Sequence, residues 1–463
     1  MTVERVEYGG GNVVVYRADV LDGLKKLASS SVHCIVTSPP YWALRSYLKA
    51  DDPLKPLEMG GEATPEAYIE RMVVAFRECR RVLRKDGVFW LNISDSYGHA
   101  SCGGGSPVGP RAGRATDKLR RDESNIRGDW ANQLQNIPHR LAEALRADGW
   151  RWRQTVIWPK AAPMPESVKG WRWERHRVKA ENGIDWIPCP GCDKCRPNGG
   201  YVLRRGNWRC TTAHEYIFMF VKGDRYFCDG EAVKEPSAEA TVSRNNYSRI
   251  TEDNADEQYA VQHDHETTAT GANPRSVWRI KGEPSRFKHY ASFPSGLPRR
   301  CIQASTSERG CCPKCGTPWS PVVERIGGPP LGDHRKLEGF ISEGYCEAHP
   351  TGTLCGKSLS DLYKKYGYPE IRIESYRPSC SCPPADPVPC IVLDPFAGTG
   401  TTLAVAVELG QHAIGLELNP EYLPMIRERV EGAIEERRIV QGGTPLTGDP
   451  AQDVVIEGRR TFF

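Results

Sequence analysis

A hydroxyl group, two prolines and an aromatic ring follow one another at Ser38-Pro39-Pro40-Tyr41. The apolar, β-branched run 32–36 precedes them. Because neither proline can donate to a sheet ladder, this run should be a buried strand that ends in a rigid loop. Ser38 and the proline carbonyls can accept hydrogen bonds from an exocyclic amine, and Tyr41 can stack on its ring. These residues suit a flat, amine-bearing substrate, and a strand-ending turn with a packed tyrosine is the alternative.

A second stretch, 390–402, runs from an apolar strand through Asp394 and a glycine turn into a helix. Glycines there let the backbone approach a ligand at a helix N-terminus. A dinucleotide pattern would place a third glycine where Leu403 stands, which disfavours a nicotinamide or flavin. Glu417 ends the next predicted strand, 17 residues beyond Gly400, about where an acid holds ribose hydroxyls. We therefore expect an adenosine-containing cofactor without a pyrophosphate.

Together the two stretches resemble motifs of the amino-methylating DNA methyltransferases. Val36-Thr37-Ser38-Pro39-Pro40-Tyr41 is similar to their catalytic motif, and 394–400 is similar to their S-adenosylmethionine motif. The catalytic motif comes first and a long middle separates the two, as in the permuted β class. The resemblance covers most of 1–305 and 388–435. It implies an α/β fold: a permuted Rossmann-like methyltransferase sheet with helices on both faces, plus an inserted target-recognition region. We expect a zinc-ribbon-like module in addition, from the spacing of cysteines between the two parts.

The resemblance also implies roles for individual residues. Ser38, Pro39, Pro40 and Tyr41 would be catalytic. S-adenosylmethionine would be held by Asp19, Phe293, Pro294, Asp394, Pro395, Phe396, Gly398, Gly400, Thr401 and Glu417. A helix N-cap is an equally good account of Asp19, and core packing is the alternative for Phe293.

Methylation of an exocyclic amine needs no cysteine adduct with the ring. As the nitrogen becomes tetrahedral, acceptors that pull on its protons should stabilise the transition state, and Ser38 Oγ and the Pro39 carbonyl are the candidates. Tyr41 would stack on a base flipped out of the duplex. Serine rather than aspartate before Pro-Pro-Tyr is the family's sign for cytosine, so the resemblance favours N4 of cytosine in duplex DNA over N6 of adenine. A zinc-containing DNA-binding protein with an inactive methyltransferase fold, or a methyltransferase of RNA or protein, is the rival.

The sequence predicts the elements that position these residues. Strands are expected at 12–19, 32–36, 88–93, 153–158, 214–221 and 412–418, helices at 64–82, 133–145 and 401–409, and a turn at 85–87. The predicted parts are a catalytic half at 1–160, a target-recognition region at 161–290, a cofactor-packing segment at 291–305, a zinc-ribbon-like insertion at 306–387, an S-adenosylmethionine-binding half at 388–440 and a polar tail at 441–463. Residues 94–97 follow a strand at the same sheet edge, so they could line a base pocket or form a satisfied turn.

Cysteines cluster at two places in a spacing that suits tetrahedral zinc, because CxxC turns hold two thiolates at one metal. The first predicted set is Cys189, Cys192, Cys195 and Cys210; the second is Cys312, Cys315, Cys380 and Cys382, with 317–379 looped out between two turns. Buried free thiols are the alternative for the first set. Cys311, or Cys346 with His349 and Cys355, could compete for the second metal.

Basic and aromatic residues alternate after Pro163. The predicted contacts to DNA are Lys169, Arg172, Arg175 and Arg177, interleaved with Trp171 and Trp173. Basic groups for phosphates beside aromatic faces are typical of a nucleic-acid surface. The glycine-rich, basic segment 100–129 could clamp phosphates as well, or be a solvated loop.

Composition sets the remaining bounds. The 463 residues carry a formal net charge of only +4, so clustering rather than total charge points to nucleic acid. No apolar run is long enough for a membrane span, and the N-terminus has no secretory pattern. The 17 cysteines would then lie in a reducing compartment, as metal ligands or thiols. We expect a cytoplasmic protein of a prokaryotic or phage-infected cell, acting on double-stranded DNA, with a cognate restriction endonuclease as a candidate partner.

Overall fold

The structure is a computed structural model. It describes residues 3–44, 46–49, 51–97, 133–163, 170–181, 183, 185–235, 273–283, 293–327 and 370–440. Several predictions fall outside these residues: the basic segment 100–129, Lys169, Cys346, His349, Cys355, most of 236–275 and the tail after 440.

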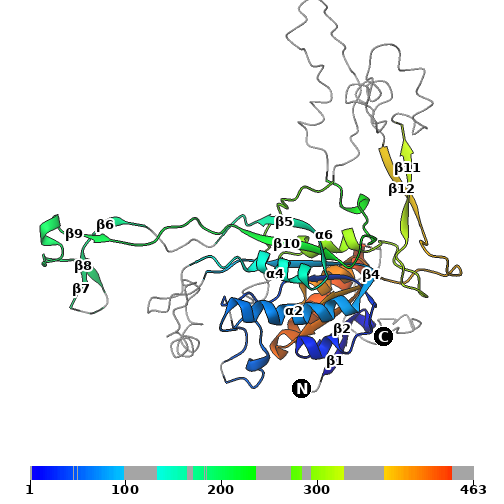
Figure 1. The fold of residues 1–463 in the computed structure, drawn as a ribbon, viewed down its shortest axis with the longest axis horizontal. Coiled ribbons are helices and arrows are strands. Elements are labelled where there is room, and N and C mark those ends of the chain that lie inside the picture. The colour runs from blue at the N-terminus through cyan, green and yellow to red at the C-terminus, as the bar shows by residue number, and fades with distance from the viewer. Residues whose placement is uncertain are drawn as a thin grey trace, which may run out of the picture.

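An eight-stranded mixed sheet forms the centre of the molecule (Figure 1). Its strands are β1 (Glu4–Tyr8), β2 (Val13–Arg17), β3 (Val32–Thr37), β4 (Leu83–Ile93), β5 (Arg151–Pro159), β10 (His214–Val221), β13 (Ile391–Asp394) and β14 (His412–Glu417). Their order is β1-β2-β14-β13-β3-β4-β10-β5. The five strands from β2 to β4 in this order run parallel, and β1, β10 and β5 join antiparallel. The carboxyl ends of β3, β13 and β14 therefore share one edge.

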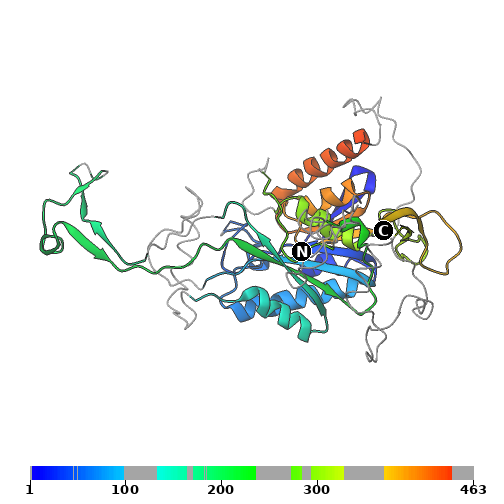
Figure 2. The ribbon, with the colours of Figure 1, turned by 90° about the horizontal axis from the view of Figure 1, so that it is seen from above.

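Helices cover both faces of the sheet (Figure 2). One face carries α1 (Val20–Leu24), α2 (Pro65–Val82) and α4 (Ile137–Ala147), and the other carries α6 (Gly296–Ser305), α8 (Thr401–Glu408) and α9 (Leu423–Val440). Because side chains alternate along a strand, Ile35 and Leu393 enter the first core while Cys34 and Val392 enter the second. The predicted α/β sheet with helices on both faces is confirmed.

The neighbouring strands β3 and β13 lead into helices on opposite faces, since β3 is followed by α2 and β13 by α8. Such a point of reversal opens a crevice beyond the carboxyl ends of the strands, which is where open α/β sheets bind ligands. Both predicted motifs begin at this point.

Two predicted boundaries are wrong. The turn expected at 85–87 lies inside β4, in a bulge: the step from Val32 to Cys34 on β3 faces the longer step from Leu83 to Val88 on β4. The helix expected from Gln133 begins only at Ile137, because the carboxylate of Asp95 accepts hydrogen bonds from the backbone N–H groups of Asn136 and Ile137, each at 2.9 Å. Asp95 is therefore part of a satisfied turn.

Two slender units extend from the sheet (Figure 1). One pairs β6 (Arg172–Arg175) with β9 (Tyr201–Arg204) and β7 (Arg177–Lys179) with β8 (Trp186–Pro188); it is called the arm, residues 170–210. The other pairs β11 (Ser320–Ile326) with β12 (Glu370–Arg377), so the segment that was expected to loop out contains a strand at each end. Short 3-10 helices are η1 (Gly9–Gly11), η2 (Lys55–Leu57), η3 (Arg196–Asn198), η4 (Glu231–Val233) and η6 (Pro420–Tyr422). No helix among the described residues is long and apolar enough to cross a membrane.

The base of the β11–β12 unit is fastened to the sheet by His33 of β3. Its Nδ1 accepts from the backbone N–H of Ile391 at 3.0 Å, so Nε2 carries the proton and donates to the carbonyl of Gly316 at 2.8 Å. Arg84 of β4 donates to the neighbouring carbonyl of Cys315 at 2.8 Å. The turn between Cys312 and Cys315 is thus held directly against β3 and β4, and β3 leads into the predicted catalytic motif.

Gly310 lies against Val388, at the base of the β11–β12 unit. Gly310→Ala should therefore be strongly destabilising. Its φ is +100°, and a Cβ would lie 2.3 Å from the carbonyl oxygen of Val388. Both the strained conformation and the clash with backbone oppose a side chain, so we expect the free energy of unfolding to fall by roughly 2–4 kcal/mol. Thermal unfolding measures this, with Gly282→Ala as control because nothing lies within 4 Å of its Cβ position. Equal melting temperatures for the two variants would contradict the prediction.

Candidate active site

The two predicted motifs meet at the carboxyl edge of the sheet. Ser38 follows β3 directly, and Asp394 is the last residue of β13, the neighbouring strand. The hydroxyl of Thr37 donates to Asp394 Oδ1 at 2.6 Å, although 357 residues separate the two along the chain. A buried hydrogen bond therefore holds the Ser-Pro-Pro-Tyr loop against the glycine turn.

Asp394 uses both of its oxygens as a clamp. Oδ1 also accepts from the backbone N–H of Phe396 at 3.1 Å, and Oδ2 accepts from Thr402 Oγ1 of α8 at 2.7 Å. Burial raises the pKa of Asp394 to about 6, and the hydrogen bonds from Thr37 and Thr402 oppose this rise. Asp394 thus joins the ends of β3 and β13 to the start of α8.

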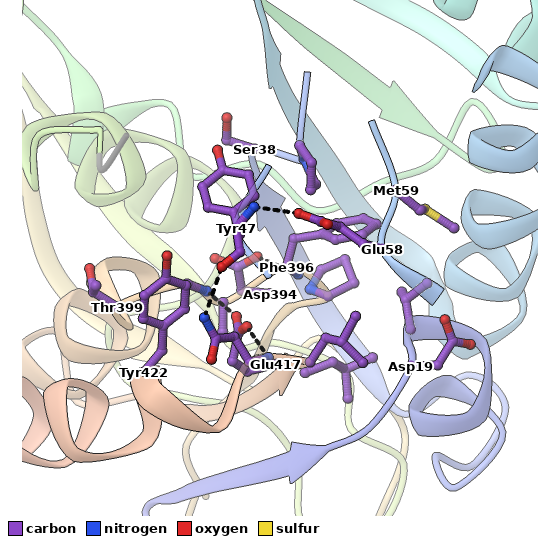
Figure 3. Close-up of a pocket in the computed structure, with 18 of the residues that line it drawn as sticks. Asp19, Ser38, Tyr47, Glu58, Met59, Asp394, Phe396, Thr399, Glu417 and Tyr422 are labelled. Carbon is purple, nitrogen blue, oxygen red and sulfur yellow. Dashed lines mark hydrogen bonds between the residues drawn. The ribbon is translucent and has the colours of Figure 1, made fainter. Parts of the chain in front are cut away.

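A pocket opens beside this clamp (Figure 3). Eight of the ten residues predicted to hold a cofactor line it: Asp19, Phe293, Asp394, Pro395, Phe396, Gly398, Thr401 and Glu417. Of the catalytic motif, Ser38 and Pro40 line it too. Ser38 lies at one end of the pocket, and Glu417 and Asp19 lie towards the other. Pro294 faces an adjoining hollow that also includes Lys160.

Gly400 contributes conformation rather than surface. It is the N-cap of α8 with φ +80°, and a Cβ there would come within 3.3 Å of the Ile426 backbone. The turn can therefore close only with glycine, and the chain then enters α8 beside the pocket.

Glu417 points its carboxylate into the turn at the end of β14. Oε2 accepts from the backbone N–H of Gly398 at 2.8 Å, and Oε1 accepts from that of Asn419 at 2.7 Å. Burial raises the pKa of Glu417 to about 8 against these two hydrogen bonds. In the free protein this buried carboxyl is thus largely protonated at neutral pH.

The position of Asp19 is compatible with both roles that the sequence left open. Its Oδ1 accepts from the backbone N–H groups of Leu21 at 3.0 Å and Asp22 at 3.4 Å, so it caps α1. It also lines the pocket. Phe293 likewise packs on the second core and lines the pocket. For these two residues the structural and the ligand-facing interpretations are compatible.

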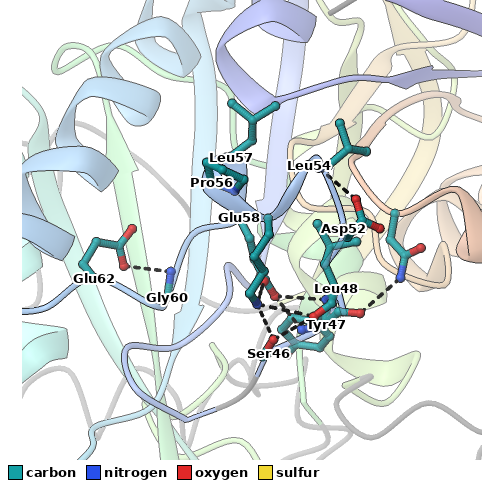
Figure 4. A network of polar contacts seen from close by, with 12 residues as sticks. Ser46, Tyr47, Leu48, Asp52, Leu54, Pro56, Leu57, Glu58, Gly60 and Glu62 are labelled. Atoms are coloured by element: carbon teal, nitrogen blue, oxygen red, sulfur yellow. Dashed lines mark hydrogen bonds and ion pairs between the residues drawn. The ribbon is translucent and has the colours of Figure 1, made fainter. Parts of the chain in front are cut away.

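Sequence analysis missed one wall of the pocket, the loop that contains Tyr47, Leu48, Leu57, Glu58 and Met59. A polar network stiffens it (Figure 4). Glu58 accepts from the backbone N–H groups of Tyr47 and Leu48 and pairs with Lys55. Arg71 of α2 donates to the carbonyl of Glu58 at 2.9 Å and pairs with Glu62. These contacts join residues 3 to 13 positions apart in the chain, and no periodic pattern marks them.

Helix α2 holds the loop of the Ser-Pro-Pro-Tyr motif in place. The hydroxyl of Tyr68 on α2 donates to the carbonyl of Pro40 at 2.9 Å. Within the described residues no donor meets the carbonyl of Pro39, which leaves that carbonyl to a ligand. Neither Pro39 nor Tyr41 lines the pocket, and stacking of the Tyr41 ring on a substrate stays a prediction.

Tyr41 joins the motif to a carboxylate on β10 that sequence analysis also missed. The Tyr41 hydroxyl donates to Glu215 Oε2 at 2.8 Å and lies 3.0 Å from Ser38 Oγ. Glu215 in turn forms an ion pair with Lys160. A charged residue inside the apolar strand 214–221 was the available signal, because a carboxylate is seldom buried without a partner.

The arm brings four metal-ligating side chains together. They are His176, Cys189, Cys192 and Cys195, whose ligand atoms all lie within 4.8 Å of one another. The sulfurs of Cys192 and Cys195 are 3.8 Å apart, as expected for two ligands at about 2.3 Å from a tetrahedral Zn²⁺. Cys210 is exposed and outside the group. His176 stands in the group where the sequence led us to expect Cys210, and the backbone N–H of Cys189 donates to the His176 carbonyl at 2.9 Å, which holds the two segments together.

The second predicted set, Cys312, Cys315, Cys380 and Cys382, also comes together with all four sulfurs within 4.8 Å. Cys311 lies apart from it, with His33 and Cys390. That third cluster does not fit a metal, since both ring nitrogens of His33 already have hydrogen-bond partners.

The arginines on the arm that were predicted to contact DNA differ in their exposure to solvent. Arg175 and Arg177 are exposed, whereas Arg172 is half-buried and donates to Glu174 at 2.6 Å. Large aromatic side chains stand beside them in solvent: Trp171, Trp173, Trp186 and Trp208, the last with 72% of its surface exposed. Arg205 lies over the Trp171 ring at 5.0 Å and Arg175 over Tyr201 at 5.3 Å. The arm thus presents a basic and aromatic surface.

Comparisons with known proteins bear on this site. A family model described as DNA methylase, of the N6/N4 type, matches residues 32–312 and 383–428. The type II methyltransferase M.XycI of Xanthomonas campestris pv. cyanopsidis is 27% identical over 418 residues, 90% of this chain and 87% of that protein. M.Cfr9I of Citrobacter freundii is 27% identical over 93% of this chain and 90% of its own. Among solved structures, the PvuII DNA methyltransferase (cytosine-N4-specific) aligns with a TM-score of 0.43 and 13% identity, over 95% of this chain and 98% of that one.

Proposed function

This chain belongs to the DNA methylase family that modifies exocyclic amino groups, and we propose that it transfers a methyl group from S-adenosylmethionine to N4 of a cytosine flipped out of duplex DNA. The observation that carries the proposal is the position of Ser38. Its hydroxyl stands at one end of the pocket whose other end holds the acid of β14. An acceptor for the amine and a holder for adenosine thus lie on opposite sides of one cavity.

The donor set of the pocket fits S-adenosylmethionine, which supplies an electrophilic methyl group when bound. Glu417 would accept hydrogen bonds from the ribose hydroxyls, Asp19 would lie at the adenine end, and Phe396 and Met59 supply apolar surface. Ser38 and the carbonyl of Pro39 would accept the two amine hydrogens and so orient the nitrogen lone pair towards the methyl group. A chain order with the catalytic strand before the cofactor strand fits the permuted β class.

A neutral serine at this place supports cytosine over adenine. Serine can both accept and donate, so it can serve the amine together with the adjacent ring nitrogen, whereas an aspartate would be charged and accept only. N6 of adenine is the alternative, and a zinc-containing DNA-binding protein without turnover is the rival of another class.

Mass spectrometry of nucleosides tests these three. Duplex DNA is incubated with the full chain and S-adenosylmethionine, digested, and compared with DNA incubated without enzyme. We expect added 4-methylcytosine. Added 6-methyladenine would overturn the choice of base and keep the chemistry. If the DNA stays unmodified although a separate titration shows that the cofactor binds, the enzyme hypothesis would give way to that of a DNA-binding protein without turnover.

The arm would read or grip the DNA, with a cognate restriction endonuclease as the companion of the methylated site. Exposed Arg175 and Arg177 suit phosphates, and the tryptophans suit unstacked bases. Lys169, the fourth contact predicted from the sequence, lies outside the described residues.

Both four-ligand groups would hold structural Zn²⁺, so we expect two zinc ions per chain. The two candidate ligand sets for the arm give different results: His176→Ala and Cys192→Ser should each lower the content to one, and Cys210→Ser should keep two. Elemental analysis of the purified, dialysed proteins counts the metal. Retention of two ions by His176→Ala together with loss of one by Cys210→Ser would restore Cys210 as the ligand.

A further inference from the structure

We infer that Glu215 is the terminal proton acceptor of the methylation site, and that it acts on the substrate amine through Tyr41 and Ser38. This rests on the proposed function and adds a positioning residue to it. Glu215 lies on β10, far from both sequence motifs and outside the pocket lining.

The four groups form a continuous chain. From the pocket inward they are Ser38 Oγ, the Tyr41 hydroxyl at 3.0 Å, Glu215 Oε2 at a further 2.8 Å, and Lys160 paired with Glu215 Oε1. Glu215 is only 6% exposed. A buried carboxylate needs a charged partner, and Lys160 supplies it.

The direction of every hydrogen bond follows from the carboxylate. An ionised Glu215 can only accept, so Tyr41 must donate to it. Asn92 Oδ1, 3.3 Å from the same hydroxyl, is an acceptor as well. Because the single Tyr41 proton is committed to these acceptors, the Tyr41 oxygen accepts and Ser38 donates. The lone pairs of Ser38 are then free to face an amine in the pocket.

Tyr41 is a neutral phenol both before and after the transfer. Burial raises the pKa of Tyr41 well above its usual range, and the charge of Glu215 adds to this rise. The tyrosine therefore passes a proton on without becoming a free phenolate. This explains how a neutral serine can stand where the resembled enzymes often have an aspartate: the carboxylate is present, two hydrogen bonds further away.

The reaction balances without another reactant. The nitrogen lone pair forms the new N–C bond while the S–C bond breaks and leaves its electron pair on sulfur. The nitrogen then gives one proton to Ser38, Ser38 gives its own to Tyr41, and Tyr41 gives its own to Glu215. Glu215 becomes a neutral carboxylic acid beside Lys160, whose side chain is 36% exposed and leads to water, where the proton is released.

The test is the single-turnover methylation rate of Glu215→Gln with saturating cofactor and DNA. Glutamine has the same size as glutamate, but its amide can donate a hydrogen bond to Tyr41. The direction of the hydrogen bonds from Glu215 to Ser38 would then be reversed. We expect a rate roughly 10²-fold lower, with dissociation constants for S-adenosylmethionine and DNA unchanged within about threefold. Glu408→Gln is the matched control, since Glu408 is a partly buried acid paired with Arg299 and lies on α8; its rate should equal that of the unsubstituted enzyme.

A double-mutant cycle separates a relay from a structural role. Because Glu215 acts through Tyr41, Tyr41→Phe should lower the rate about as much as Glu215→Gln, and the double variant should be no slower than either. Glu215→Asp should recover part of the rate. An unchanged rate in Glu215→Gln, or effects that multiply in the double variant, would overturn the inference and leave the proposed function standing. No methylation by the unsubstituted enzyme would overturn both. Should Glu215→Gln not fold, Tyr41→Phe alone and with Glu215→Asp gives the same cycle.

Discussion

Ser38→Ala should lower the single-turnover methylation rate by roughly 10²–10³-fold, as expected for loss of one preorganised partner at a centre where charge develops. The methyl group of alanine cannot accept a hydrogen from the amine. The hydrogen-bonded chain to Glu215 is also interrupted, because Ser38 Oγ joins the pocket to the Tyr41 hydroxyl. The measurement is a rapid-quench time course with labelled S-adenosylmethionine and enzyme in excess over DNA.

Cofactor binding should survive this change, because the polar groups at the opposite end of the pocket are untouched. A dissociation constant within about threefold of the unsubstituted value would separate lost chemistry from lost binding. Ser31→Ala is the control: Ser31 lies just before β3 and is half-buried, and its hydroxyl donates to the carbonyl of Ala28 at 2.7 Å. Full activity of Ser38→Ala would remove this serine from the mechanism and with it the case for cytosine.

Glu417→Gln should weaken binding of S-adenosylmethionine roughly 100-fold at pH 8, since hydrogen bonds to a charged acceptor contribute about 1.5–3 kcal/mol each. The ribose hydroxyls are donors and favour the ionised carboxylate. Because burial raises the pKa of Glu417 to about 8 in the free protein, binding below that pH must release a proton. Isothermal titration should therefore show affinity rising up to about tenfold per pH unit between pH 6 and 8.

The carboxyl group of Glu417 should make the folding stability fall as pH rises, whereas the affinity for S-adenosylmethionine rises with pH. Its folded-state pKa of about 8 lies above the unfolded value of 4.5, so the folded protein holds the extra proton. That stabilisation is complete below pH 4.5 and is lost as pH rises to about 8. Glu417→Gln should flatten both profiles, while Glu421→Gln, an exposed acid in the following turn, should leave both unchanged. A pH-independent affinity in the unsubstituted protein would show that the cofactor does not select the ionised carboxylate.

Sequence alone determined the parts of this protein that local chemistry specifies. The run 32–36 ends at two prolines that cannot enter a ladder, and Gly398 and Gly400 mark a turn that only glycine can close. These signals lie within a few residues of what they position. They therefore located β3, β13 and both motifs, whereas the family resemblance was needed to predict the pocket residues Asp19 and Phe293.

Tertiary structure decided which distant groups face these motifs. Glu215 reaches Tyr41 across 174 residues. Strand pairing in the arm, which cysteine spacing does not record, brings His176 rather than Cys210 to Cys189, Cys192 and Cys195. The loop that contains Glu58 forms one wall of the pocket, and the contacts that hold this loop follow no helical or strand periodicity. A sequence pattern records the conformation of neighbouring residues. Contacts between residues far apart depend on sheet order and register, which the energy of the whole fold sets.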